Sequence, residues 1–227
     1  MARLFFLCMA CALCQAGLVA NDRSRGKIVV DASQGGGTWW HPQAETFDSN
    51  APHQGKRLAD TLRRAGWEVV EIARNTVVTD QLAGAKIAIR VNASGLYQES
   101  EVVAYRDFVL NGGSVLLVRG FVRENRSEDK VANEFGIKFS KVVRAETFSH
   151  WEDHPITENL RLSRYRIGSV VVEAPEESIP LGYVNNNELA LGLLEWGSGK
   201  VIYMSTISPL IVSDPIVHRI IKELASD

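Results

Sequence analysis

The sequence contains very little cysteine, and all of it lies close to the amino terminus. Its three cysteines are Cys8, Cys11 and Cys14, and no other cysteine follows them. If the segment that carries them is removed, the mature protein has neither a disulfide nor a thiol nucleophile. Such a protein is excluded from thiol-dependent catalysis, because that chemistry requires a thiolate.

A strong excess of either charge is also missing. The chain has 25 Lys and Arg against 27 Asp and Glu, which gives a formal net charge of −2. Nucleic-acid binders normally carry a basic patch or stripe, so we expect no nucleic-acid partner. The sequence also lacks a Gly-x-Ser-x-Gly elbow, a P-loop and a dinucleotide fingerprint. The sequence therefore lacks the usual motifs of a serine hydrolase and of a nucleotide-binding protein, and we expect no cofactor.

The amino-terminal segment is the most apolar part of the chain. Arg3 precedes an apolar run over residues 4–13, and small residues follow, including Ala16 and Ala20. This order is typical of a signal peptide, and the run is too short for a comfortable membrane span. We predict a signal peptide over 1–20, cleaved after Ala16 or Ala20, and a secreted or periplasmic domain over 21–227 without a stable membrane span. The alternative is an uncleaved anchor.

From residue 27 onward, short β-branched runs alternate with amphipathic helical segments. The runs predict strands at 27–31, 68–72, 86–91 and 114–118. The intervening segments predict helices from near Asn50 to Gly66, over 80–84, over 99–110 and over 128–135. Strict alternation implies right-handed crossovers and a parallel sheet with helices on both faces.

The C-terminal third has a different pattern. Short β-rich segments at 142–143, 167–173, 179–184, 189–196 and 201–206 follow one another closely, and Pro215 begins a last helix. Strands joined by such short turns are antiparallel. The predicted fold is therefore α/β: a flavodoxin-like, doubly wound, mostly parallel sheet with an antiparallel hairpin extension.

Three passages occur in an unusual order. The first is a strand ending at Asp31, followed by a helix and GWEV at 66–69, and the second is NGGSVLLVRG at 111–120. The third is DHPITENL at 153–160, before the β-rich region and the strand that begins GKV at 199. From residue 27 to the C-terminus, the chain thus resembles the class I glutamine-amidotransferase-like superfold. Its non-catalytic branches are the most similar: ThuA-like sugar-utilisation proteins, gliding-motility GldG-type domains and intraflagellar-transport amino-terminal domains.

The chain departs from the catalytic members of that superfold at one turn. Those members carry a nucleophilic cysteine at a sharp turn after a central strand, and the matching residues 118–121 here read Val-Arg-Gly-Phe. The resemblance therefore implies a non-catalytic member, and the absence of a mature cysteine excludes glutaminase activity.

Ligands of open α/β sheets bind beyond the carboxyl ends of the strands. A carboxylate, an amide and a guanidinium at that edge suit a polar small molecule such as a sugar, and a pair of tryptophans can stack on a sugar ring. The alternatives are that Asp31 caps the next loop and pairs with Arg119, and that the tryptophans only pack. The direction of the strand that ends at Ser205 and Thr206 is left open. The predicted ligand-binding residues are Asp31, Gln34, Trp39, Trp40, His41, Asn92 and Arg119.

A second candidate site lies at 150–154, where two histidines stand four residues apart with two carboxylates between them. On a helix, His150 and His154 would form a plausible zinc pair. Pro155 argues against a helix there, because the residue before a proline disfavours the α conformation. A metal site at these residues is the minor expectation.

We therefore expect an exported, non-catalytic binding module that recognises a carbohydrate-like small molecule or a protein partner. One alternative is a hydrolase of a sugar or ester, with or without a metal, that uses Asp31, His41 and the turn with His150 and His154. The other is a scaffold subunit of an envelope complex.

Overall fold

The parallel part of the sheet has the strand order of a flavodoxin-like protein. The computed structural model describes residues 24–31, 55–72, 78–91, 98–120, 129–139, 145–160, 164–167, 169–185 and 187–226. Within these residues the order β2-β1-β3-β4-β12 is parallel throughout. The predicted fold class is thereby confirmed. The five strands are β1 (Lys27–Asp31), β2 (Glu68–Ile72), β3 (Ala85–Val91), β4 (Ser114–Val118) and β12 (Gly199–Met204).

An antiparallel extension continues the sheet beyond β12, as the short turns predicted. In order, β11, β10 and β7 pair antiparallel, while β9 pairs with β11 and with β5. A separate small sheet pairs β6 with β8. These strands are β5 (Lys138–Phe139), β6 (Ala145–Thr147), β7 (His150–Trp151), β8 (Arg164–Ile167), β9 (Val171–Glu173), β10 (Ile179–Val184) and β11 (Glu188–Trp196).

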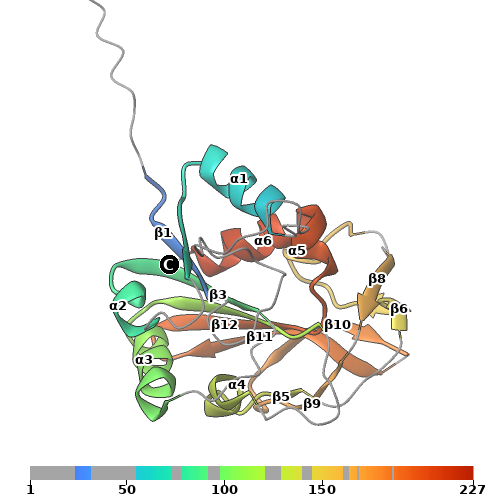
Figure 1. Cartoon of the computed structure of the whole chain (residues 1–227). Helices are drawn as coiled ribbons and strands as arrows, with labels where there is room; N and C mark the ends of the chain where they lie inside the picture. Colours follow the sequence, from blue (N-terminus) through green and yellow to red (C-terminus); the bar gives the residue numbers. More distant parts are fainter. Residues whose placement is uncertain are drawn as a thin grey trace, which may run out of the picture.

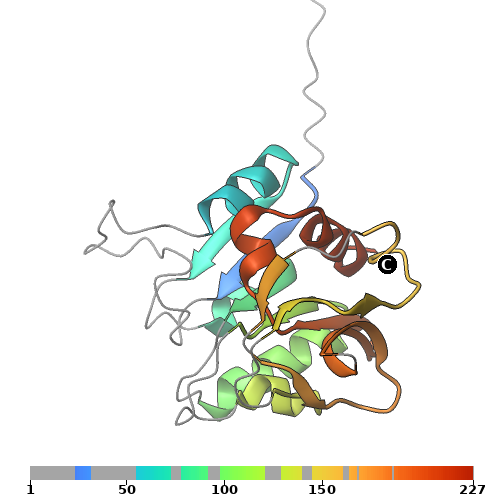
Figure 2. The ribbon, with the colours of Figure 1, turned by 90° about the vertical axis from the view of Figure 1, so that its right-hand side faces the viewer.

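Helices cover both faces of the sheet (Figures 1 and 2). On one face, α1 (Lys56–Arg64), α5 (Ser208–Val212) and α6 (Pro215–Leu224) pack on one hydrophobic core. On the other, α2 (Val78–Leu82), α3 (Glu99–Leu110) and α4 (Lys130–Glu134) pack on a second core. No helix of the described ranges is both long and apolar enough to cross a membrane.

The alternation of side chains along each strand divides residues between the two cores. In β1, Ile28 and Val30 face the α1 side, while Val29 faces the α3 side. In β3, Ile89 and Ala88 are divided in the same way. Because side chains alternate with a period of two, a polar residue two positions after Val29 or Ala88 lies on the same α3 face of the sheet.

Several predicted boundaries need correction. The segment 167–173 is not one strand, because β8 and β9 belong to different sheets, and buried Ser169 between them donates a hydrogen bond to the Arg119 carbonyl at 2.6 Å. The last strand ends at Met204, where the chain turns into the unpredicted helix α5. The amide of Ser208 donates to Thr206 Oγ1 at 3.2 Å at this turn. The segment predicted at 142–143 lies outside the described residues.

Candidate polar site at the carboxyl edge of the sheet

Two charged side chains meet where the connections from β1 and β3 diverge. Asp31 ends β1 and is paired in register with Arg90 of β3. In the order β2-β1-β3-β4-β12, the chain leaves β1 toward one side of the sheet and later reaches β3 on the other. This is the topological switch point at which doubly wound sheets bind ligands. The alternation of both strands turns the two side chains toward α3.

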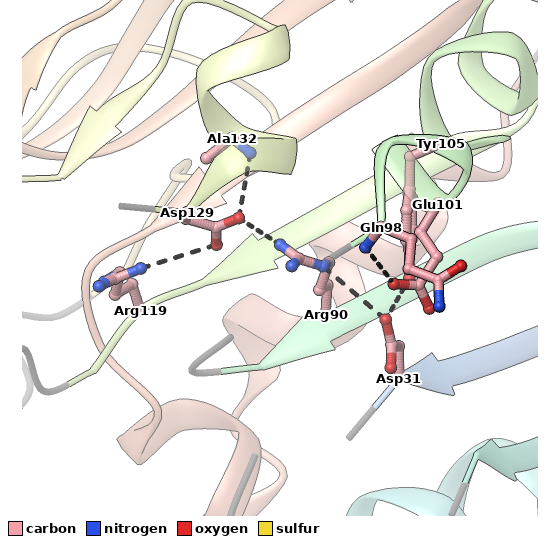
Figure 3. A network of polar contacts seen from close by, with 8 residues as sticks. All are labelled: Asp31, Arg90, Gln98, Glu101, Tyr105, Arg119, Asp129 and Ala132. Carbon is pink, nitrogen blue, oxygen red and sulfur yellow. Dashed lines mark hydrogen bonds and ion pairs between the residues drawn. The ribbon is translucent and has the colours of Figure 1, made fainter. Parts of the chain in front are cut away.

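Asp31 is held by a phenol and a guanidinium inside the protein (Figure 3). The hydroxyl of Tyr105, on α3, donates to Asp31 Oδ2 at 2.6 Å. Arg90 Nε lies 3.8 Å from the same oxygen, and neither charged side chain is exposed. The Arg90 guanidinium also lies over the Tyr105 ring, 5.5 Å from its centroid. The pair is thus closed to solvent. Inside the protein, charges interact more strongly than they do at its surface.

Asp129 links Arg90 to Arg119. Its Oδ1 accepts a hydrogen bond from Arg90 Nη1, and its Oδ2 lies 3.9 Å from Arg119 Nη1. The same carboxylate caps α4, because Oδ1 also accepts from the Ala132 amide at 3.2 Å. Figure 3 shows the result, a row of alternating charges from Asp31 through Arg90 and Asp129 to Arg119.

The fifth parallel strand brings hydroxyl groups to the same edge. Since β12 runs parallel to β4, Ser205 and Thr206 follow its carboxyl end, which answers the direction that the sequence left open. Both residues are fully buried. Among the residues that the structure describes, the Ser205 hydroxyl has no hydrogen-bond partner, so this edge includes a polar group not used by them.

The structure brings together two of the predicted ligand-binding residues. Asp31 and Arg119 belong to one network, yet they stand at opposite ends of it, with Arg90 and Asp129 between them (Figure 3). In place of the alternative, a direct ion pair between Asp31 and Arg119, the network contains three ion pairs: Asp31 with Arg90, Arg90 with Asp129, and Asp129 with Arg119. The other predicted residues, Gln34, Trp39, Trp40, His41 and Asn92, lie outside the described residues.

Three members of the network were not predicted from sequence: Arg90, Tyr105 and Asp129. Arg90 was detectable as the one charged residue inside the otherwise apolar end of a strand, IAIRV. Asp129 was detectable as a helix cap, since its neighbours predict a helix. No local signal marks Tyr105, which reaches Asp31 from 74 residues away in the sequence.

The second predicted site lies elsewhere. His150 is in β7 and His154 is in the turn after it. Five strands lie between β7 and β1 in the sheet. At a spacing of roughly 4.8 Å per strand, β7 and β1 are therefore about 30 Å apart. The His150 ring stacks on Tyr183 at 4.6 Å, and His154 Nδ1 accepts from the Ile156 amide at 3.2 Å. Nowhere in the described ranges do three His, Cys, Asp or Glu side chains form a group that could hold a metal.

The turn that carries cysteine in catalytic amidotransferases is tightly packed here. A Cβ added at Gly120, just after β4, would lie 2.7 Å from Ile207 Cγ2 and 3.1 Å from the Ile207 backbone nitrogen. A contact of 2.7 Å is shorter than real Cβ contacts, so a side chain at Gly120 requires at least the Ile207 side chain to shift.

No known protein family matches the sequence, and no curated protein is similar to it in sequence. The fold, however, recurs in solved structures. The mmIFT52 N-terminal domain superposes with a TM-score of 0.65 at 14% identity, over 88% of this chain and 98% of that domain. A ThuA-like protein from Bacteroides uniformis gives 0.53 at 14% identity, over 86% and 89% of the two chains.

A longer enzyme contains the same fold as one part. The cold-adapted beta-galactosidase from Rahnella sp. R3 has a TM-score of 0.55 at 15% identity, and the match covers 87% of this chain but 31% of the enzyme. At such identities the likeness establishes a shared fold and nothing more. At the level of the fold, these likenesses are consistent with the resemblance suggested by the three sequence passages.

Proposed function

We propose that the chain is an exported, non-catalytic binding module that recognises a carbohydrate-like small molecule at the carboxyl edge of its sheet. One observation carries the proposal: a buried row of four alternating charges fixes the ends of β1, β3 and β4 at the switch point. Ligand sites need side chains held in position by other groups, and such a row supplies that support.

The network residues position the site, and other residues touch the ligand. Asp31 and Arg90 are 2% and 1% exposed, so they are poorly placed for direct contact. The residues that follow β1 and β3 in sequence are better candidates, namely Gln34, Trp39, Trp40, His41 and Asn92. Amide, imidazole and indole groups are suited to hydrogen bonding and stacking with a sugar.

A binding role is favoured over catalysis by the chemistry at this edge. The mature sequence expected after export has no cysteine, and the hydrolase alternative needs Asp31 to act with His150 or His154, which lie across the sheet. The likeness to a ThuA-like protein and to part of a beta-galactosidase is compatible with a sugar ligand. The fold also recurs in the mmIFT52 N-terminal domain, whose name indicates no sugar, so a module that binds a protein partner is kept as the second candidate.

The experiment separates ligand contact from support. Wild type is titrated calorimetrically with galactose, mannose, glucuronic acid and galacturonic acid. If Trp39 and Trp40 contact the sugar, replacing both with alanine weakens binding by about 1–3 kcal/mol, while the melting temperature stays close to that of wild type. Asp31→Asn instead lowers the melting temperature, because it leaves Arg90 with one charged neighbour fewer in a closed site.

Asp60→Asn, on the exposed side of α1, serves as the matched control and changes neither quantity. If none of the four sugars binds the wild type, the sugar proposal is wrong and the protein-partner candidate is preferred. If binding survives the double tryptophan change, the contact residues are wrongly assigned.

A further inference from the structure

A groove of about 780 Å³ lies at the amino-terminal ends of β1 and β3, between α1 and α6 (Figures 1 and 2). It is lined by Arg25 before β1, Lys86 of β3, the end of α1, the turn at 155–158 and the C-terminal half of α6. Strand β1 has five residues, so about 17 Å separates its two ends at roughly 3.3 Å per residue. The groove thus lies at the opposite edge of the sheet from the charged network, and no network residue lines it.

The groove has a surplus of positive charge. Of the described residues that line it, four are Lys or Arg and two are Glu. One of these acids is already paired, because Lys200 Nζ lies 3.0 Å from Glu223 Oε1. Arg25 and Lys222 are exposed, and among the described residues neither of them forms an ion pair. Two cations at the rim are therefore available to an anionic partner.

A third cation, Arg219, is held in the groove by the backbone. Its Nη1 donates to the carbonyl of Ile156 at 3.4 Å and to the carbonyl of Glu158. Carbonyl groups carry no full charge, and Arg219 forms no ion pair with any carboxylate of the described ranges. The turn at 155–158 thus orients the guanidinium without neutralising it, and the donors on Nε and Nη2 suit a carboxylate or sulfate group.

The positive charge continues along α1, whose last turn lines the groove. This helix carries four exposed cations, Lys56, Arg57, Arg63 and Arg64, against one acid, Asp60. Arg57 and Arg64 are about two helical turns apart on one face, which places them about 10 Å apart along the helix axis. We call the groove together with these α1 side chains the cationic track.

The nearly neutral net charge of −2 conceals this concentration. Acidic residues are grouped elsewhere, with Glu173, Glu176 and Glu177 exposed at the end of β9 and in the segment that follows it. Charge of one sign that is gathered along a cleft attracts a ligand of the opposite sign more strongly than scattered charge does. The track is thus a local site for an anion on a molecule that has no overall attraction for one.

The large apolar side chains of the groove are closed to a ligand. Leu62, Ile156 and Ile221 are each 3% exposed or less, and Trp67 is 6% exposed. A peptide partner or a membrane surface is normally anchored by apolar contacts, and single-stranded nucleic acid by stacking on aromatic rings. The accessible groups are instead charges and hydrogen-bond donors, which suit a hydrophilic chain that carries an anionic group on each unit.

We propose that the cationic track binds an acidic polysaccharide, a chain whose sugar units carry carboxylate or sulfate groups. Arg219 is its oriented contact, Arg25 and Lys222 bind further anionic groups at the rim, and Arg57 and Arg64 extend the contact along α1. A chain fits better than a single sugar, because one sugar unit could not reach both the groove and the far end of α1. The site is independent of the one proposed at the carboxyl edge.

The test titrates the protein by calorimetry with two probes, an oligomer of galacturonic acid and chondroitin sulfate, at about 50 and about 200 mM salt. At least one probe is expected to bind, and more tightly at the lower salt concentration, because salt screens exposed charges. Arg25→Gln together with Lys222→Gln is expected to weaken the binding about threefold to tenfold, the effect of two exposed ion pairs. Arg25→Lys together with Lys222→Arg keeps both charges and is expected to bind like wild type.

The matched control removes the same amount of charge from the other side of the sheet. Lys130→Gln together with Lys138→Gln changes two exposed residues of α4 and β5 and is expected to leave the affinity within twofold of wild type, since neither residue lines the groove. A thermal melt of each variant checks that the fold is kept. Equal losses in the groove pair and in this control pair would show that only net charge matters, and the inference would be wrong.

The remaining outcomes separate this inference from other partners and from the proposed function. If neither probe binds, the inference is wrong. It is also wrong if only poly-L-glutamate or vesicles of phosphatidylglycerol bind and their binding requires Arg25 and Lys222, because the track then serves a peptide or a membrane. The change of Trp39 and Trp40 to alanine is expected to leave polysaccharide binding intact. Loss of that binding in the tryptophan variant, with no loss in the Arg25 and Lys222 variant, would overturn the track and support the carboxyl edge.

Discussion

Arg90 is a charged residue in a strand that is otherwise buried and apolar. Its side chain has no exposure and lies between two carboxylates, those of Asp31 and Asp129. The alternation of the strand predicts which face Arg90 occupies, but not its partners, because Asp129 comes from a helix start 39 residues later. The sequence thus contained half of the site: the charged residues in the strands and at the helix start were recognisable, and their pairing with one another was not.

Replacing Arg90 tests how much stability the network contributes. Arg90→Met keeps most of the side-chain volume but leaves Asp31 and Asp129 without this cation. We expect the free energy of unfolding to fall by about 3–5 kcal/mol, the usual cost of breaking a buried pair by removing one partner. Urea denaturation followed by circular dichroism measures the change.

Arg106→Met provides the matched control. Arg106 forms ion pairs with Asp107 and Glu134 at 3.2 and 3.6 Å, but its side chain is 40% exposed. Solvent screens such pairs, so the expected loss is about 1 kcal/mol or less. Equal losses in the two variants would mean that the buried network contributes no more than a surface pair.

Two helices begin with the same type of cap. The Asp129 carboxylate accepts from the Ala132 amide at 3.2 Å at the start of α4, and Asp214 accepts from the Ile216 amide at 3.1 Å at the start of α6. Only Asp129 also neutralises two arginines. A comparison of the two caps therefore separates capping from charge pairing.

Asp214→Ala should cost about 0.5–2 kcal/mol, as is usual for the loss of an N-cap. Asp129→Ala should cost more, about 3–5 kcal/mol, because it also leaves Arg90 and Arg119 short of a buried partner. Thermal and urea unfolding of both variants measure the difference. Similar losses would show that Asp129 acts as a helix cap alone.

Elements were predictable where one local pattern decided them. Strands β1, β2 and β4 were predicted to the residue, because each is a short β-branched run between turn signals. The segment 167–173 was misjudged as one strand, since its division between two sheets depends on Ser169 and the distant Arg119 carbonyl. Helix α5 was missed because SPLIV is a single turn or so of helix, too short for a helical period to be recognised.

At the scale of the whole molecule, topology was more predictable than function. Alternating strands and helices predict the parallel order, and short turns predict the antiparallel extension, because few chain paths satisfy both. The place of a ligand is less constrained. It depends on which polar groups meet at the strand ends, and this emerges only when Asp31, Arg90 and Asp129 come together from two strands and a helix start.

Export is the proposal that concerns the entire chain, and its first twenty residues carry the prediction. We expect expression in a host with a periplasm to yield a protein that begins at Gly17 or Asn21, because Ala16 and Ala20 offer the small residue that precedes a cleavage site. Intact-mass spectrometry should find that form, and iodoacetamide should add no mass, since the three cysteines are removed with the segment. Leu7→Arg, which interrupts the apolar run, is the control and should leave the precursor uncleaved. A wild-type product that keeps Ala2 and all three cysteines would contradict both the cleavage and the thiol-free mature protein.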